Sequence, residues 1–403
     1  MKRTLAKLLT IVLVVSMFAG CSGETGSSSE ESKSAASVQG SESAPEQQTK
    51  PADTFFGIEP LPERTTVRIA LFTGSHHGNG FIVADKKGWF DELNIDVEYV
   101  PFVNGPIMME AMNDWDVGTT GAPGCINGMV GRDLKVLALS SADTLLQLYV
   151  REESPIWQSG KGHIEGHPDI YGTPEDWKGT TWLLPIGTTM QYTLASTLEC
   201  MGLTTDDVTM VNMDATSAYN AFKAGEGDGC GIWSSVAIAA RDAGYKMPAD
   251  IISTGELMST GFFANPQYLA SNRDITKTVM ELYLETATWG YQPENREECA
   301  QILLEHCEGE GLKTSFADCL YTYELCSQFS IEEQAQMAKT PIDDPQGIYN
   351  DMNELQYSII NIFDFFESIG NYDADARVKI LGNDLIDTSL LLELEADRAV
   401  RNS

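Results

Sequence analysis

The chain has 403 residues, with 59 acidic and 26 basic side chains and a formal net charge of −33 at pH 7. Nucleic-acid binding and docking on anionic lipid both need a basic face, so this charge argues against both. The length suggests about two or three domains, and 42 % apolar residues suffice for a sizeable core. Eight Cys are too few for a small disulfide scaffold.

The N-terminus has the pattern of an export signal. Basic residues in Met1-Lys2-Arg3 precede an apolar run from Leu8 to Phe18, which is shorter than a membrane-spanning helix. The run ends in Ala19-Gly20-Cys21, which resembles a lipobox, where the Cys is lipidated and becomes the new N-terminus. We therefore expect residues 1–20 to be a lipoprotein signal peptide and Cys21 to carry a lipid. The alternative is an ordinary secreted protein.

The segment after Cys21 is rich in Ser, Glu, Gly and Gln. Such a composition cannot bury enough apolar surface to offset the entropy lost on ordering. We expect residues 21–64 to be a disordered tether between the membrane and a folded domain. Seven Cys follow Cys21 without a Cys-x-x-Cys pair, so a zinc site is not expected, although the four nearest the C-terminus could form disulfides.

The next stretch alternates strand and helix patterns. Branched apolar residues predict strands, and apolar residues at helical spacing predict the helices between them. The alternation indicates a parallel sheet covered on both faces. The expected strands are 66–72, 95–100, 116–119 and 134–140, with helices at 81–90, at 105–112 and up to residue 130.

The pattern restarts near residue 180 and predicts a second, smaller α/β lobe. Longer helices follow from about residue 262, and we expect them to brace one lobe. The expected strands of the second lobe are 180–185, 208–213 and 229–233, with helices at 190–201, 216–224 and 235–243. The expected long helices are 274–290, 294–307, 314–328, 345–368 and 385–401.

Short segments in a fixed order carry a family resemblance between about residues 66 and 307. They include Ala84-Asp85-Lys86-Lys87-Gly88-Trp89-Phe90, Asp116-Val117-Gly118, Trp177-Lys178-Gly179 and Gly187-Thr188-Thr189-Met190-Gln191-Tyr192. Together they resemble the nitrate/sulfonate/taurine and thiamine-precursor substrate-binding proteins of ABC importers. The resemblance implies the α/β type II periplasmic-binding-protein fold, with two lobes joined by two crossover segments and a cleft between the lobes.

We place the crossovers near residues 148 and 252. Lobe one is then 65–148 plus 253–403, including the extra C-terminal helices, and lobe two is 149–252. In open parallel sheets, ligands bind beyond the carboxyl ends of the strands, where helix N-termini offer unpaired N–H groups. The loops at those ends supply the expected ligand-binding residues, namely Ser75, His76, His77, Asn79, Asn104, Thr120, Gly121, Ala122, Thr188, Thr189, Gln191, Tyr192, Asp214 and Trp233.

Each of these residues also has a purely structural interpretation. The Gly, Thr and Asn residues suit turns, His76 and His77 suit an exposed loop, and Trp233 suits a core. The sequence His163-Ile164-Glu165-Gly166-His167 could hold a metal, but a Gly-rich loop supplies no helical register, so neither a metal nor a cofactor is expected.

The resemblance implies a substrate-binding component of an ABC importer, a lipid-anchored monomer on the extracytoplasmic face of the membrane. It would pass a small molecule to a permease driven by a separate ATPase, without catalysis and without catalytic residues. The alternatives are a ligand-sensing module for a receptor and an enzyme related to thiamine-pyrimidine synthesis. The expected ligand is a sulfonate, taurine or nitrate-like anion. Because no candidate loop contains Lys or Arg, a thiamine-precursor-like heterocycle suits it at least as well.

Overall fold

The computed structural model describes residues 54–72, 76–256, 258–312, 314–326, 328–344, 346–349, 352–382 and 385–401. These residues belong to one compact unit of the chain, Thr49–Ser403. The predicted signal peptide, the lipidation site Cys21, most of the predicted tether and the candidate contact Ser75 lie outside the described residues. Within the described ranges, no helix combines the length and the apolar character that crossing a membrane requires.

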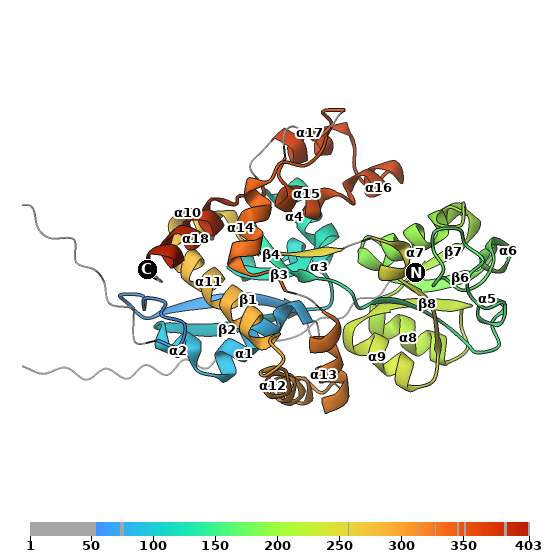
Figure 1. Cartoon of the computed structure of the whole chain (residues 1–403), viewed down its shortest axis with the longest axis horizontal. Helices are drawn as coiled ribbons and strands as arrows, with labels where there is room; N and C mark the ends of the chain where they lie inside the picture. Colours follow the sequence, from blue (N-terminus) through green and yellow to red (C-terminus); the bar gives the residue numbers. More distant parts are fainter. Residues whose placement is uncertain are drawn as a thin grey trace, which may run out of the picture. The chain divides into compact units, whose positions relative to one another are not determined.

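The first of two five-stranded sheets forms the centre of lobe one (Figure 1). Its strand order is β2-β1-β3-β10-β4, and β10 runs antiparallel to both of its neighbours. The strands are β1 (Thr65–Phe72), β2 (Ile95–Phe102), β3 (Val117–Gly121), β4 (Lys135–Ala142) and β10 (Ser259–Ala264). Lobe one therefore holds residues from both sides of lobe two in the sequence.

The second sheet forms the centre of lobe two, with the order β7-β6-β8-β5-β9. Here β5 is the antiparallel strand, inserted between β8 and β9. Both sheets thus combine parallel βα units with one antiparallel strand at the same place in the order. The strands are β5 (Leu146–Val150), β6 (Thr181–Leu184), β7 (Thr209–Asn212), β8 (Gly229–Trp233) and β9 (Lys246–Asp250).

The chain passes between the sheets twice. The first passage lies between β4 and β5, at residues 143–145, and the second lies between β9 and β10, at residues 251–258. Strand β5 already pairs in the second sheet, so the first passage lies a few residues before the expected position of 148. The two passages touch, because the Asp143 N–H donates to the Met258 carbonyl at 2.7 Å.

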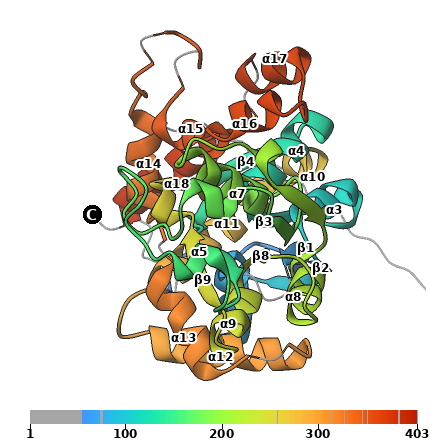
Figure 2. The ribbon, with the colours of Figure 1, turned by 90° about the vertical axis from the view of Figure 1, so that its right-hand side faces the viewer.

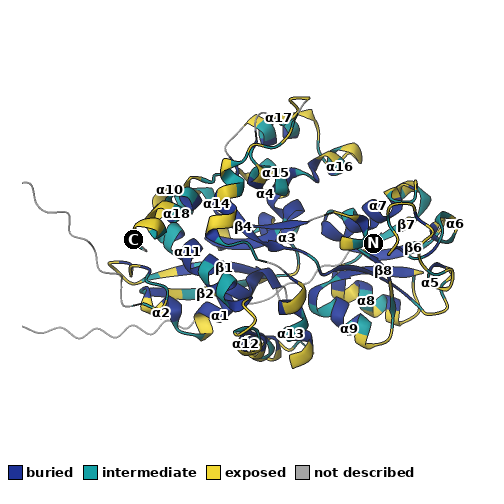
Figure 3. Ribbon diagram, in the orientation of Figure 1, coloured by how far each residue is buried: buried dark blue, intermediate teal, exposed yellow. Residues whose placement is uncertain are grey.

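Helices cover both faces of each sheet, which leaves the central strands in the interior, whereas the edge strands β2 and β7 are partly exposed (Figure 3). In lobe one these are α1 (Asn79–Lys86), α2 (Trp89–Glu92), α3 (Gly105–Glu110) and α4 (Ala122–Arg132), with short 3₁₀ turns at His76–Gly78 and Met112–Asp114. In lobe two they are α5 (Pro155–Gln158), α6 (Pro174–Trp177), α7 (Thr189–Glu199), α8 (Ala215–Lys223) and α9 (Ser234–Asp242), with 3₁₀ turns at Thr205–Asp207 and Ile252–Thr254.

The C-terminal helices add to lobe one. α1 packs against α11 and α12, whereas α4 packs against α15 and α17. Figure 2 shows α12 at the bottom of the view and α15 and α17 at the top. The helices are α10 (Pro266–Ser271), α11 (Arg273–Gly290), α12 (Arg296–Gly309), α13 (Phe316–Leu325), α14 (Ile331–Lys339), α15 (Glu354–Ile360), α16 (Phe363–Ser368), α17 (Ala374–Gly382) and α18 (Ser389–Arg401).

Two expectations differ from the structure. The predicted single helix 345–368 is replaced by α15 and α16. Its start moves because the Asn353 side chain accepts from the Gln356 N–H at 2.9 Å and so caps α15 there. The predicted tether is also too long, because part of residues 54–64 packs on lobe one: Ile58 and Leu61 are buried, and the Phe55 ring stacks on Trp89 at 4.5 Å.

Candidate functional site

A pocket lies between the two lobes, at the carboxyl ends of their strands. It encloses about 390 Å³ of space between the protein atoms, with the open solvent at its mouth included. Both lobes contribute, so the lobes must separate for a ligand to enter a closed pocket. The lining residues are Phe72, His77, Gly105, Pro106, Thr120, Gly121, Pro123, Gly124 and Asp143 of lobe one, and Thr188, Thr189, Trp233 and Ser234 of lobe two.

Four helices begin at this pocket, namely α3 and α4 from lobe one and α7 and α9 from lobe two. The first N–H groups of a helix have no partner within the helix and carry partial positive charge. They therefore suit an electron-rich ligand group. Not all of them are available, because Pro106 in α3 and Pro123 in α4 have no N–H. The Ile107 and Met190 N–H groups already donate to the Asn104 and Thr188 side chains. No Lys or Arg is among the described lining residues.

Small residues let the starts of α3 and α4 approach each other. A Cβ added to Gly105 would lie 2.6 Å from the Thr120 Oγ1 and 3.0 Å from the Gly124 Cα. Any larger residue at Gly105 would therefore push the two helices apart. The Asn104 side chain caps α3 by accepting from the Ile107 N–H at 3.0 Å, which leaves its oxygen engaged within the turn.

Ser234 has an unusual backbone conformation in the pocket wall. Its φ of 50° lies in the left-handed region, which non-glycine residues rarely occupy. The side chain is buried at the first position of α9, directly after Trp233 at the end of β8. Such strain is concentrated at binding sites, so it supports a ligand role for this turn.

His77 and Asp143 are the titratable residues of the lining, and His76 lies directly behind them. The His76 Nε2 is 3.8 Å from the Asp143 Oδ1, beyond hydrogen-bond distance. Burial lowers the pKa of His76 to about 4. Burial, with a contribution from His76, also lowers the pKa of His77 well below its ordinary value. Burial raises the pKa of Asp143 to about 7, against a smaller lowering by the Leu145 N–H.

The turn that carries the two histidines is fixed from lobe one. The Tyr283 hydroxyl donates to the His77 carbonyl at 2.7 Å, and the Thr119 hydroxyl donates to the same carbonyl at 3.1 Å. The His77 ring packs edge-on against Phe72, with ring centroids 5.1 Å apart. The imidazole is therefore held at the pocket rather than exposed in a loop.

The structure brings some of the predicted site residues together in this pocket. These are His77, Thr120, Gly121, Thr188, Thr189 and Trp233. Sequence reasoning missed three residues of the lining, Phe72, Gly124 and Asp143. Four others lie in the loops that it selected but were not among the expected contacts: Gly105, Pro106, Pro123 and Ser234. The missed signal was the position of Asp143, an acidic residue directly after the fully buried end of strand β4.

Other predicted residues do not line the pocket. His76 borders a smaller cavity next to the pocket. Asn79 and Ala122 are buried in lobe one. The Tyr192 hydroxyl donates to the Glu256 Oε2 at 3.2 Å. Asn104 and Asp214 are helix caps, and the Gln191 side chain accepts from the Gly187 N–H at 2.8 Å. Short polar residues before a helix serve capping and ligand contact equally well, so the sequence did not separate the two roles.

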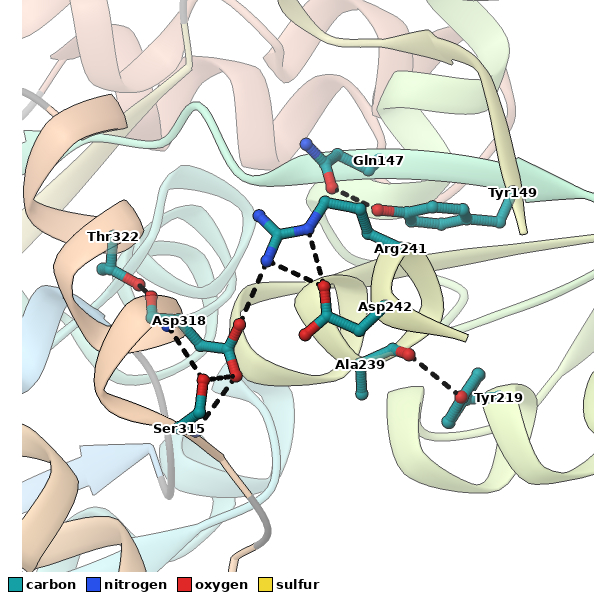
Figure 4. Close-up of polar contacts among 9 residues, drawn as sticks. All are labelled: Gln147, Tyr149, Tyr219, Ala239, Arg241, Asp242, Ser315, Asp318 and Thr322. Atoms are coloured by element: carbon teal, nitrogen blue, oxygen red, sulfur yellow. Dashed lines mark hydrogen bonds and ion pairs between the residues drawn. The ribbon is translucent and has the colours of Figure 1, made fainter. Parts of the chain in front are cut away.

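Contacts between the lobes continue beside the pocket. Arg241 of α9 donates from Nη2 to the Asp318 Oδ1 of α13 at 3.0 Å (Figure 4). Its guanidinium also lies 4.4 Å from the Tyr321 ring centroid. Asp318 is fixed in turn by the Ser315 hydroxyl, which donates to its Oδ2 at 2.6 Å. Tyr192 packs edge-on against Phe365 at 5.4 Å. These contacts hold the lobes together in the structure.

No group of three or more His, Cys, Asp or Glu side chains suited to a metal occurs in the described part of the chain. In the segment 163–167, the His163 Nε2 lies 2.9 Å from the Ser159 carbonyl oxygen. The His167 Nδ1 lies 3.3 Å from the Ser253 carbonyl oxygen. Both histidines are thus engaged with backbone groups.

The family model described as NMT1/THI5 like matches residues 76–295, which contain all the lining residues except Phe72. The chain belongs to the NMT1/THI5-like family. The resemblance inferred from the sequence is therefore confirmed at the level of the family.

Relatives of this NMT1/THI5-like protein include periplasmic binding proteins. A Brachyspira hyodysenteriae protein described as an ABC transporter periplasmic binding protein is 22 % identical over 198 residues, covering 48 % of this chain and 57 % of the relative. A binding protein of Brucella abortus is 25 % identical over 182 residues, covering 45 % of this chain and 51 % of the relative. The chain thus matches about half the length of these relatives.

Solved structures show the same fold. The periplasmic nitrate-binding protein NrtA from Synechocystis PCC 6803 has a TM-score of 0.61 at 16 % identity, covering 84 % of this chain and 90 % of that one. The periplasmic aliphatic sulphonate binding protein SsuA from Escherichia coli has a TM-score of 0.55 at 19 % identity, covering 77 % and 91 %. The predicted α/β periplasmic-binding-protein fold, with additional C-terminal helices, is confirmed.

Proposed function

We propose that this protein is the extracytoplasmic substrate-binding component of an ABC importer and captures a small molecule by closing its two lobes. The pocket between the lobes carries the proposal, because residues from both lobes and four helix N-termini converge there. Proteins of this kind bind small ligands and deliver them to permease subunits. The membership in the NMT1/THI5-like family supports the same role.

The ligand range remains the one expected from the sequence: a sulfonate, taurine or nitrate-like anion, or a thiamine-precursor-like heterocycle. Helix N-termini and the Thr189 side chain suit an anionic or electron-rich group, whereas the Thr188 hydroxyl already donates to the Pro185 carbonyl at 2.7 Å. Trp233, which is partly exposed in the pocket, offers a ring face to an apolar or heterocyclic part. We propose binding without chemical conversion of the ligand.

A lipid on Cys21 would anchor the protein, as a monomer, to the outer face of the cell membrane. The N-terminal sequence pattern alone supports this part of the proposal.

A binding screen tests the function. The purified protein is mixed with taurine, alkanesulfonates, nitrate, pyrimidines and amino acids, and its melting temperature and calorimetric binding heats are measured. The proposal predicts a Kd in the micromolar range or below for one class, with the probe recovered unchanged. Conversion of a probe would contradict it, and so would the absence of any binding.

A further inference from the structure

The charge of the pocket points to a chemical feature of the ligand. Asp143 is the one carboxyl group among the described lining residues, and no Lys or Arg accompanies it there. Its side chain is 6 % exposed. Its Oδ1 is buried and has no hydrogen-bond partner within the described part of the chain.

A buried carboxyl oxygen without a donor is unfavourable, by about 1–3 kcal/mol or more for a charged group. The neighbouring side chains do not supply that donor. The His76 ring is too distant at 3.8 Å, and the Cys326 thiol, which lies close enough to interact electrostatically with Asp143, remains protonated and is a weak donor. His77 lies in the same lining and is kept neutral by burial. Because Asp143 lines the pocket, a ligand bound there would be in a position to supply the donor that the described side chains do not.

We infer that the ligand carries a protonated nitrogen whose N–H groups pair with the Asp143 carboxylate. This inference rests on the proposed capture function and narrows its ligand class. The helix N-termini of the same pocket receive the electron-rich end of the molecule, so a zwitterion satisfies both parts of the lining. Nitrate and unsubstituted alkanesulfonates carry no such nitrogen and would leave Asp143 unpaired.

The position of Asp143 links this pairing to closure. Asp143 lies on the first passage between the lobes, and its N–H is bonded to the second passage at Met258. A ligand that pairs with the carboxylate therefore touches the segment about which the lobes move. Burial also raises the pKa of Asp143 in the ligand-free pocket, so pairing with a cation displaces a proton into the solvent.

Matched probes test the inference. Calorimetry compares 2-aminoethanesulfonate with ethanesulfonate, and 3-aminopropanoate with propanoate, so that each pair differs in the ammonium group alone. The wild-type protein should bind one amino compound about 10- to 100-fold more tightly than its partner, as expected for a buried charged hydrogen bond. Asp143→Asn should reduce this preference to about threefold or less. The matched control is Asp133→Asn, because Asp133 caps the end of α4 that faces away from the pocket. This variant should retain the preference for the amino compound.

The outcomes separate the inference from the function. If ethanesulfonate or propanoate binds as tightly as its amino partner, or if Asp143→Asn keeps the preference, the inference is overturned while capture stands. If neither these four probes nor any compound of the wider screen binds, the capture function fails as well. A melting curve shows whether Asp143→Asn is folded, since an unfolded variant would lose binding for an unrelated reason. In that case the wild-type protein decides alone, through its preference for each amino compound over the partner that lacks the ammonium group.

Discussion

Closure of the lobes can be tested with one added methyl group. Gly121 ends β3 in lobe one, and Thr189 begins α7 in lobe two. A Cβ on Gly121 would lie 3.1 Å from the Thr189 Cγ2, closer than ordinary van der Waals contact. The φ of Gly121 is −62°, which alanine adopts without strain. Gly121→Ala should therefore leave lobe one folded and act as a wedge between the lobes.

The magnitude follows from this contact. Overpacking by one methylene in a well-packed site raises the free energy by about 1–3 kcal/mol. The lobes can relieve part of it by separating a few tenths of an ångström, so we expect about 1–2 kcal/mol against the closed state. That corresponds to a Kd that is about 5- to 30-fold weaker. The ligand-free protein, which can open, should melt within about 2 °C of wild type.

Calorimetry with the tightest probe of the screen measures the effect. Thr189→Ser removes the Cγ2 methyl and keeps the hydroxyl, so the double variant Gly121→Ala/Thr189→Ser should recover most of the affinity. Gly131→Ala is the matched control, because a Cβ there meets no atom within 4 Å. An unchanged Kd for Gly121→Ala, or a double variant as weak as the single one, would refute the reasoning.

Four further results are expected. Asp143 holds its proton more tightly in the folded than in the unfolded protein, since burial raises its pKa to about 7. Its contribution to the free energy of unfolding is thus greatest below about pH 4 and falls as the pH rises through the pKa of the folded state. Urea unfolding at several pH values should show this fall in the free energy of unfolding for wild type but not for Asp143→Asn. Trp233→Ala should weaken the best probe about tenfold by calorimetry, whereas Tyr192→Phe, outside the pocket, should change the Kd less than twofold. Arg241→Gln removes the ion pair to Asp318 between the lobes and should speed hydrogen exchange in α9 and α13. Cys21→Ser should move the protein from the membrane fraction to the soluble fraction on an immunoblot.

The alternation of strands and helices was predictable because local periodicity encodes it. The antiparallel strand β10 was not predicted: its sequence, Ser-Thr-Gly-Phe-Phe-Ala, is buried throughout and shows no alternation. Its place between β3 and β4 depends on pairing with segments more than a hundred residues away. Such tertiary pairing is not visible in a local pattern. The helix α14 was missed as well, although its Ser330–Glu333 capping box marks its start.

The pocket was predicted in part for the same reason. The rule that ligands lie beyond carboxyl strand ends selected Thr120, Thr188 and Trp233, which line the inter-lobe pocket. Asp143 follows a strand as well, but it precedes a crossover instead of a helix, so no helix start marked it. Asn104 matches the same pattern, and the structure shows it as the cap of α3 beside the lining.

The central claim is that the ligand is held between the lobes. Hydrogen exchange measured with and without the tightest probe tests this claim most directly. The account predicts that binding slows exchange together in 104–106 and 120–124 of lobe one and in 187–190 and 232–235 of lobe two. Protection confined to one lobe, or centred on the surface groove around Trp157 and Tyr171 in lobe two, would contradict it.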